Sequence, residues 1–223
     1  MNRSDANRFS FGLFMALLVI LVAGSLVPLK AQTFEGVVQF NLTSSQGEMP
    51  MTYMMKGENV RMEFEGRPGM KGVMLLDGKE NKAYMLISQM NAYMELPTGQ
   101  TPEGTKTKPE ITKTGKTQKI LGYDCEQLII KDAGRVTEAW VTKAIGKFQK
   151  FGMGGGMQQG KQESWQDNLA GSGMFPVRVV TKEGDAETSK MEVTKIEKKS
   201  LDASLFKIPE GYQKMSMPMG KPR

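Results

Sequence analysis

Histidine is absent from this chain of 223 residues, and cysteine occurs once, at Cys125. Without histidine the chain has no His-based catalytic triad, no imidazole general base and no imidazole metal ligand. A single cysteine excludes an internal disulfide, a CxxC redox pair and a four-cysteine zinc site. Catalysis would depend on carboxylates, lysine, tyrosine and hydroxyl groups, and no local motif combines them. We therefore expect a protein that is not an enzyme and needs no cofactor.

Long blocks of like charge are also missing. The chain has 30 Lys and Arg against 24 Asp and Glu, a net charge of +6. The two signs alternate along most of the sequence, as in residues 55–67 (MKGENVRMEFEGR). Alternating charge is typical of a solvated surface, so we expect no nucleic-acid partner. Residues 155–161 match a phosphate-binding GxxxxGK loop, but Gln162 stands where Ser or Thr would hold magnesium, which indicates an ordinary loop.

The longest apolar run lies near the N-terminus. Arg3 and Arg8 precede residues 11–27, which are nearly all apolar, and small or breaking residues follow up to Ala31. This order is typical of a secretory signal peptide, which we place at residues 1–31. The predicted location is periplasmic or secreted, without stable membrane insertion after cleavage. The run approaches the roughly 20 residues that span a bilayer, so an N-terminal membrane anchor is the alternative.

Apolar and polar residues alternate along much of the remaining chain. Val60, Met62 and Phe64, for example, alternate with Arg61 and Glu63. Such alternation predicts antiparallel strands with one buried face, and the Gly-, Asn- and Asp-containing turns between them predict hairpins. The sequence predicts nine strands, at residues 34–43, 50–56, 60–65, 72–77, 82–87, 118–131, 135–142, 175–182 and 187–197.

Helical signals are few and short. We predict one or two helical turns within residues 87–96, another short helix within residues 142–151, and a third at residues 201–206 with Ser200 as its cap. Residues 97–117 are rich in Thr, Lys, Gly and Pro, which predicts a connecting loop.

Three segments resemble a known family. Residues 113–126 (KTGKTQKILGYDCE), followed by residues 140–143 (WVTK), are similar to the core motif of bacterial secreted proteins with the domain of unknown function 4412. Residues 201–212 (LDASLFKIPEGY) resemble the end of that domain. The resemblance implies a mainly β protein: a single antiparallel curved sheet, or half-barrel, with a few short helices on its concave side. It also implies export into the periplasm of a Gram-negative cell, a fold similar to periplasmic lipoprotein-carrier-like proteins, and no known activity.

The domain organisation follows from these patterns. We expect one β-rich half-barrel domain over residues 32–212 and a flexible tail, rich in Met and Pro, over residues 213–223. Cys125 falls in a predicted strand. Because no histidine is present to activate its thiol, we expect it to be buried as a small apolar residue.

Methionine is unusually abundant, with 19 residues, many at positions that the alternation points inward. Its flexible, polarizable side chain adapts to irregular apolar ligands. We therefore predict a non-catalytic binding protein for a lipid or other hydrophobic molecule, held in a Met-lined groove. A closed core that the methionines simply fill is the alternative interpretation. The candidate ligand-binding residues are Phe40, Tyr53, Met55, Met62, Phe64 and Trp140.

The tail offers a second hypothesis. Met215, Met217 and Met219 stand at alternate positions, and thioether sulfur suits Cu(I). The alternative function is therefore periplasmic Cu(I) binding or buffering, against a simple polar tail with incidental methionines. An enzyme of unidentified type is the third hypothesis.

Overall fold

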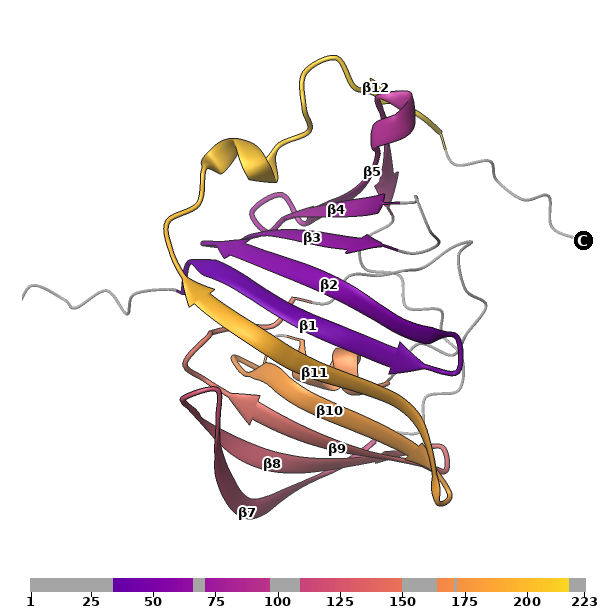
Figure 1. Ribbon diagram of the computed structural model, residues 1–223, viewed down its shortest axis with the longest axis vertical. Helices are drawn as coiled ribbons and strands as arrows, with labels where there is room; N and C mark the ends of the chain where they lie inside the picture. The colour runs from indigo at the N-terminus through magenta and orange to yellow at the C-terminus, as the bar shows by residue number, and fades with distance from the viewer. Residues whose placement is uncertain (1–33, 66–70, 97–108, 150–163, 171, 217–223) are drawn as a thin grey trace, which may run out of the picture. The chain divides into compact units, whose positions relative to one another are not determined.

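Figure 1 shows the computed structural model, which describes residues 34–65, 71–96, 109–149, 164–170 and 172–216. Twelve strands in these ranges form one open sheet, in the order β12-β6-β5-β4-β3-β2-β1-β11-β10-β9-β8-β7. All neighbours are antiparallel except β12, which runs parallel to β6. The mainly β fold and the single curved sheet are thus confirmed, with one parallel pair at an edge.

The strands are β1 (Gly36–Ser44), β2 (Gly47–Lys56), β3 (Asn59–Glu65), β4 (Lys71–Asp77), β5 (Lys82–Ile87), β6 (Ala92–Leu96), β7 (Glu110–Ile120), β8 (Tyr123–Asp132), β9 (Arg135–Thr142), β10 (Phe175–Glu183), β11 (Ala186–Lys198) and β12 (Gln213–Lys214). The described helices are α2 (Ser164–Leu169) and the single turns η2 (Ser88–Met90) and η3 (Ala203–Phe206).

Two meanders build the sheet. Strands β1 to β6 follow one another as neighbours, and so do β7 to β11. The meanders join where β1 pairs with β11, from Gly36 opposite Lys198 to Ser44 opposite Ser189. The centre of the sheet therefore depends on a pairing between the beginning and the end of the domain.

The prediction of one strand over residues 118–131 is wrong, because a turn divides that segment into β7 and β8. Leu121 and Gly122 both have positive φ, 50° and 84°. A two-residue hairpin turn of this kind needs positive φ at both central positions. The edge strand β7 before this turn begins at Glu110. Residues 110–117 of the predicted loop are therefore strand, and residues 97–108 lie outside the described part of the chain.

The helix predictions also need correction. Residues 87–96 contain the single turn η2 and then β6, because Asn91 ends the turn with φ of 46°. Residues 143–149 contain no helix. Asp202, not Ser200, caps η3: its carboxylate accepts a hydrogen bond of 2.8 Å from the Ser204 N–H. The helix α2 was not predicted.

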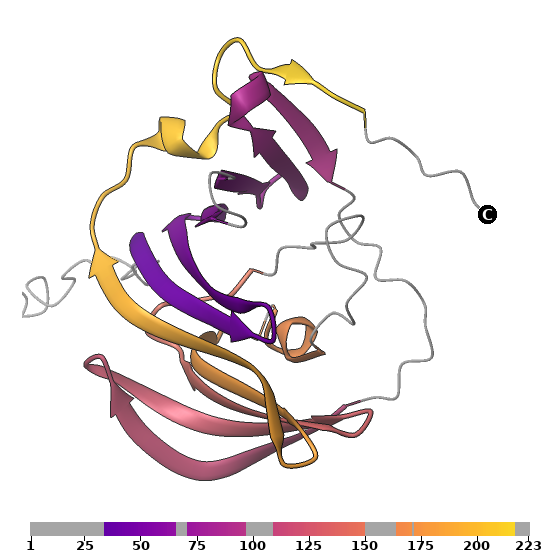
Figure 2. The ribbon, with the colours of Figure 1, turned by 45° about the vertical axis from the view of Figure 1, so that its right-hand side comes forward.

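The sheet buries apolar side chains on both faces. On the inner face, residues of both meanders pack with Ile145, Phe148, Trp165 and Leu169, which come from the segment after β9 and from α2. In Figure 2 the strands curve around α2, the orange coil. On the outer face a smaller cluster lies over β4 and β5, at Val73, Leu75 and Leu86.

Candidate functional site

A row of methionines crosses the inner face of the first meander. Tyr53 on β2 lies opposite Met62, which lies opposite Met74; Met74 lies opposite Met85, and Met85 opposite Met94. Opposed residues of antiparallel strands share a face, with Cβ atoms about 4.5–5.5 Å apart. The methionine row (Met62, Met74, Met85 and Met94) is buried at its first two members and partly exposed at its last two. The row therefore passes from buried to partly exposed positions between β4 and β5.

Aromatic rings close the inner face at the buried end of this row. The ring centroids of Tyr53 and Phe148 lie 6.1 Å apart in a stacked arrangement. Phe148 also contacts Trp165 of α2 at 5.8 Å, and Phe175 meets Tyr53 edge-on at 5.6 Å. These four aromatic rings fill the space that an empty groove would require at Tyr53.

The Tyr53 hydroxyl is fully buried and hydrogen-bonded. It donates to the backbone carbonyl of Gln149 at 3.0 Å and accepts the Gln149 N–H at 3.1 Å. Burial raises the pKa of Tyr53 well above its ordinary value, so the phenol stays neutral. Its role in the structure is to anchor the segment after β9 against the sheet.

Five of the six candidate ligand-binding residues come together on the inner face: Phe40, Tyr53, Met55, Met62 and Phe64. The first four are buried, with 8%, 0%, 5% and 5% of their surface exposed, and Phe64 is half-buried. Their role in binding stays a prediction, but any ligand at the four buried positions would have to displace packed side chains.

Trp140 lies on the other face of the sheet. It stands opposite Arg178, which in turn stands opposite Glu192, in a row that also includes Asn41. Its indole N–H donates to the Glu138 carboxylate at 2.8 Å. The strand register thus places Trp140 on the opposite face from the other five candidates, although its buried side chain belongs to the same hydrophobic cluster as Phe40 and Tyr53.

The methionine tail lies mostly outside the described residues. Met215 follows β12, is half-buried, and donates its backbone N–H to the Tyr93 carbonyl at 2.8 Å. Met217 and Met219 lie beyond the described part of the chain. Within that part, no group of three His, Cys, Asp or Glu side chains is arranged to hold a metal ion. Cu(I) binding stays a prediction.

Cys125 is buried, as the sequence predicts, with 1% of its surface exposed. Its thiol contacts the Tyr123 carbonyl at 3.5 Å. Burial raises the pKa of the thiol, which disfavours the nucleophilic thiolate.

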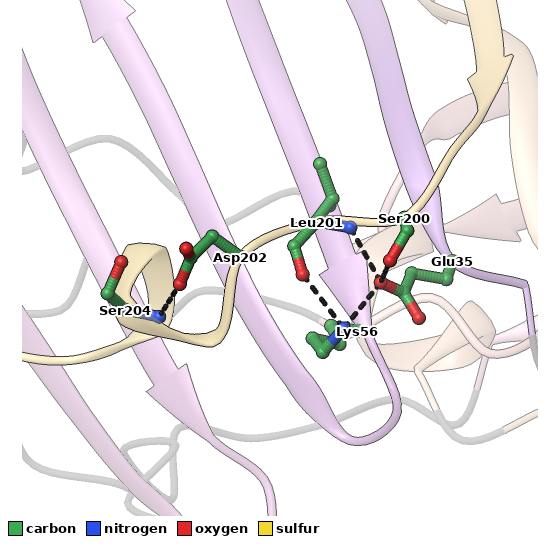
Figure 3. A network of polar contacts seen from close by, with 6 residues as sticks. All are labelled: Glu35, Lys56, Ser200, Leu201, Asp202 and Ser204. Atoms are coloured by element: carbon green, nitrogen blue, oxygen red, sulfur yellow. Dashed lines mark hydrogen bonds and ion pairs between the residues drawn. The ribbon is translucent and has the colours of Figure 1, made fainter.

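A strap formed by residues 199–215, which we call the C-terminal strap, covers the outer face of β3 to β6. Figure 3 shows how it begins. The Glu35 carboxylate accepts hydrogen bonds from Lys56 at 2.6 Å and from the Leu201 N–H at 2.7 Å, while Lys56 also donates to the Leu201 carbonyl at 2.8 Å. These donors, Lys56 first, hold the pKa of Glu35 below its ordinary value.

The strap continues across the sheet to its edge. Arg61 donates to the Leu205 carbonyl at 3.0 Å. Ile208 and Tyr212 pack against the outer cluster of Val73, Leu75 and Leu86. At the end, β12 pairs with β6, and Lys214 forms an ion pair with Glu95 at 2.5 Å. The strap thus covers the face and completes the edge of the first meander.

Sequence reasoning missed two members of the methionine row, Met74 and Met94. Met74 lies within a run of four apolar residues in β4, which is buried on both faces and so shows no alternation. Met94 alternates with Tyr93 and Glu95. That signal was present, but the segment was interpreted as helical.

No helix among the described residues is long and apolar enough to cross a membrane. The predicted signal peptide at residues 1–31 lies outside them.

The family comparison confirms the resemblance. The family model described as "Domain of unknown function (DUF4412)" matches residues 34–212. This chain belongs to that family. No curated protein matches its sequence.

Solved structures show where the fold recurs. One structure of PNGF-II, in the P21 space group, matches 82% of this chain with a TM-score of 0.51 and 15% identity. Another, in the C2 space group, matches 83% with a TM-score of 0.48 and 16% identity. This chain spans about a third of PNGF-II, 32% and 31% of the two chains. A Vibrio parahaemolyticus domain described as an outer membrane lipoprotein-sorting protein matches 77% of this chain and 87% of its own, with a TM-score of 0.23 and 11% identity. The PNGF-II likeness shows a shared fold.

Proposed function

We propose that this protein is an exported, non-catalytic binding protein for a lipid or another hydrophobic molecule. The observation that carries the proposal is the partly exposed end of the methionine row, at Met85 and Met94. Met85 and Met94 are partly exposed, and so are Phe64 and Leu96 on the same inner face. Thioether side chains are flexible enough to follow an irregular apolar ligand. The export step rests on the signal peptide predicted at residues 1–31, which would direct the protein to the periplasm or out of the cell.

The binding site we propose is narrower than the groove predicted from the sequence. Tyr53 and Met62 are buried in the core, next to the aromatic rings, so they do not contact the ligand directly. The ligand contacts the surface over β5 and β6. Covering roughly 300 Å² of apolar ligand surface would contribute ~7 kcal/mol at ~25 cal/mol per Å², before association costs several kcal/mol. Modest affinity for a broad range of apolar ligands follows.

The test replaces Met85 with Glu. Because Met85 is partly exposed, the new carboxylate reaches water and the protein stays folded, but uptake of a fluorescent fatty-acid probe falls sharply. Met54→Glu is the matched control. Met54 is also a half-buried strand methionine, but it lies on the outer face opposite Arg61, so probe uptake should be unchanged.

Probe titration and thermal melting on the same samples separate the outcomes. A folded Met85→Glu protein that takes up the probe as well as the parent would overturn the proposal. Equal losses in Met85→Glu and Met54→Glu would also overturn it, since the effect would then not depend on the inner face. Native mass spectrometry of protein purified from the periplasm identifies the natural ligand, and would show bound copper if the tail holds it.

A further inference from the structure

A cavity of about 280 Å³ lies where strands β8 and β9 part. Their ladder runs from Asp132 opposite Arg135 to Glu126 opposite Val141, and although the structure describes all of residues 121–146, the two strands form no pair beyond that point. Residues 122–124 and Glu126 line one side of the cavity, and residues 141–144 with Met174 line the other. The separated strand ends therefore border a space that is open to solvent on one side.

Both walls of the cavity are held by the sheet. Tyr123 and Cys125 remain paired with Ile120 and Gln118 of β7. Thr142 remains paired with Phe175 of β10. The walls also correspond to the two sequence motifs noted above, at residues 113–126 and 140–143. The fold brings these separate motifs to one cavity, whose width is fixed by strands on both sides.

The cavity presents one acid and one base that have no partner among the residues that the structure describes. Asp124 is neutralised by Lys119 at 2.8 Å. Glu126 and Lys143 are both exposed, and within the described ranges neither side chain forms an ion pair or a hydrogen bond. Tyr123, Val141 and Met174 supply apolar surface between them.

We propose that this cavity binds a small zwitterion, with Glu126 at the ligand's ammonium group and Lys143 at its carboxylate. The site is distinct from the methionine row and does not depend on the function proposed there. Its volume is near the lower end for ligand pockets, which range over roughly 300–1,000 Å³. It therefore suits a molecule the size of an amino acid or a dipeptide.

The spacing of the two charges favours a dipeptide. Glu126 lies opposite Val141, so Lys143 is its diagonal neighbour. Diagonal neighbours in a regular ladder are about 7–8 Å apart, and the parting of the strands increases that distance. The terminal charges of a dipeptide lie farther apart than those of a free amino acid, so a dipeptide reaches both side chains more easily.

The test is an NMR titration of the ¹⁵N-labelled protein with leucine, with alanyl-leucine, and with that dipeptide acetylated at its N-terminus or amidated at its C-terminus. We expect saturable shifts at residues 122–126 and 141–144 with the free dipeptide. Removing either terminal charge should weaken binding by roughly tenfold, the value of one charge-assisted hydrogen bond. Leucine binding as tightly as the dipeptide would support the proposal and assign a free amino acid as the ligand.

Variants assign the two roles. Lys143→Met should bind the free and amidated dipeptides alike, and Glu126→Gln should bind the free and acetylated dipeptides alike. Lys79→Met, at an exposed turn between β4 and β5, is the matched control and should keep the full preference. The proposal is overturned if no zwitterion gives saturable shifts, if the parent binds capped and free dipeptides equally, or if Lys79→Met and Lys143→Met behave alike.

Discussion

The two edges of the sheet are protected in different ways. At one edge, β12 pairs with β6, and the C-terminal strap covers the neighbouring outer face. At the other edge, β7 has no further strand beside it among the described residues, and nearly all of its side chains are exposed. Unpaired strand edges invite association with other chains. One edge of the sheet is therefore protected by chain packed over it, and the other edge must be protected by its own sequence.

Charge and irregularity protect the β7 edge. Lys113, Lys116 and Lys119 point to solvent along it, and a bulge interrupts its pairing with β8 between Lys113 and Thr117. Gly115 allows this irregularity, with φ of 76°. Lysines and bulges are both known means of discouraging further strand pairing. The covered edge, in contrast, contains the apolar residues Ala92 and Tyr93 beside β12.

Removing the C-terminal strap should have the largest effect on stability, because it exposes the protected edge. A chain ending at Lys199 loses buried Leu201 and uncovers Val73, Leu75 and Leu86. At about 1.5–3 kcal/mol for each of these four apolar side chains, the free energy of unfolding should fall by roughly 6 kcal/mol or more. Denaturant titration measures the loss. A chain ending at Ser216 keeps the strap and is the control; equal stability of the two truncated chains would contradict the role given to the strap.

Substitutions in strands near the two edges of the sheet should lower the free energy of unfolding by different amounts. Leu75 is 2% exposed on β4, whereas Ile111 is 48% exposed on β7. Leu75→Ala should cost about 2–5 kcal/mol of unfolding free energy because it leaves a cavity beneath the strap. Ile111→Ala should change it by about 0.5 kcal/mol or less. Similar costs in chemical denaturation would show that the β7 edge is buried in solution.

The lysines of β7 should affect association rather than stability. Replacing Lys113, Lys116 and Lys119 together with Thr keeps β-strand propensity but removes the charge. We expect a nearly unchanged melting temperature and a concentration-dependent increase in mass by analytical ultracentrifugation. Three Lys→Thr changes at Lys182, Lys195 and Lys198, on the interior strands β10 and β11, are the control. They should cause no concentration-dependent increase in mass.

The smallest expected effect is the pH dependence of stability that comes from Glu35, which binds the start of the C-terminal strap. The folded-state pKa of Glu35 is lowered by Lys56 and by the Leu201 N–H. Its stabilising contribution is therefore present above the pKa of the unfolded chain and is lost as pH falls through the lowered folded-state pKa. Glu35→Gln should be slightly less stable than the parent at neutral pH, and the two melting temperatures should converge in acid. A difference that persists at the lowest pH would rule out the ionised carboxylate as its source.

The sequence predicted local features better than long-range ones. Alternation at Val60, Met62 and Phe64 correctly indicated a strand with an inward apolar face. The hairpin at Leu121 was missed because leucine rarely adopts positive φ, so its side chain gave no turn signal. β12 was missed because a two-residue strand exists only through its pairing with β6.

The candidate site shows the same limit. Trp140 was grouped with the candidate ligand-binding residues, although Glu138, two residues earlier in the same strand, shares its face and accepts a hydrogen bond from its indole. The parting of β8 and β9 depends on how each strand pairs with its other neighbour. No pattern within one segment specifies such a gap, even where the motifs that line it are visible.

The pairing of β1 with β11 has a consequence for how the chain folds. Gly36 must find Lys198, across most of the domain, before the two meanders can join. Closing so long a loop costs conformational entropy before the contact contributes any stability, so proteins rich in such pairings fold slowly. The hairpins of each meander can form early, but β1 and β10 remain open edges until β11 inserts between them. The insertion of this last long strand is therefore the step at which we expect the folding barrier to lie.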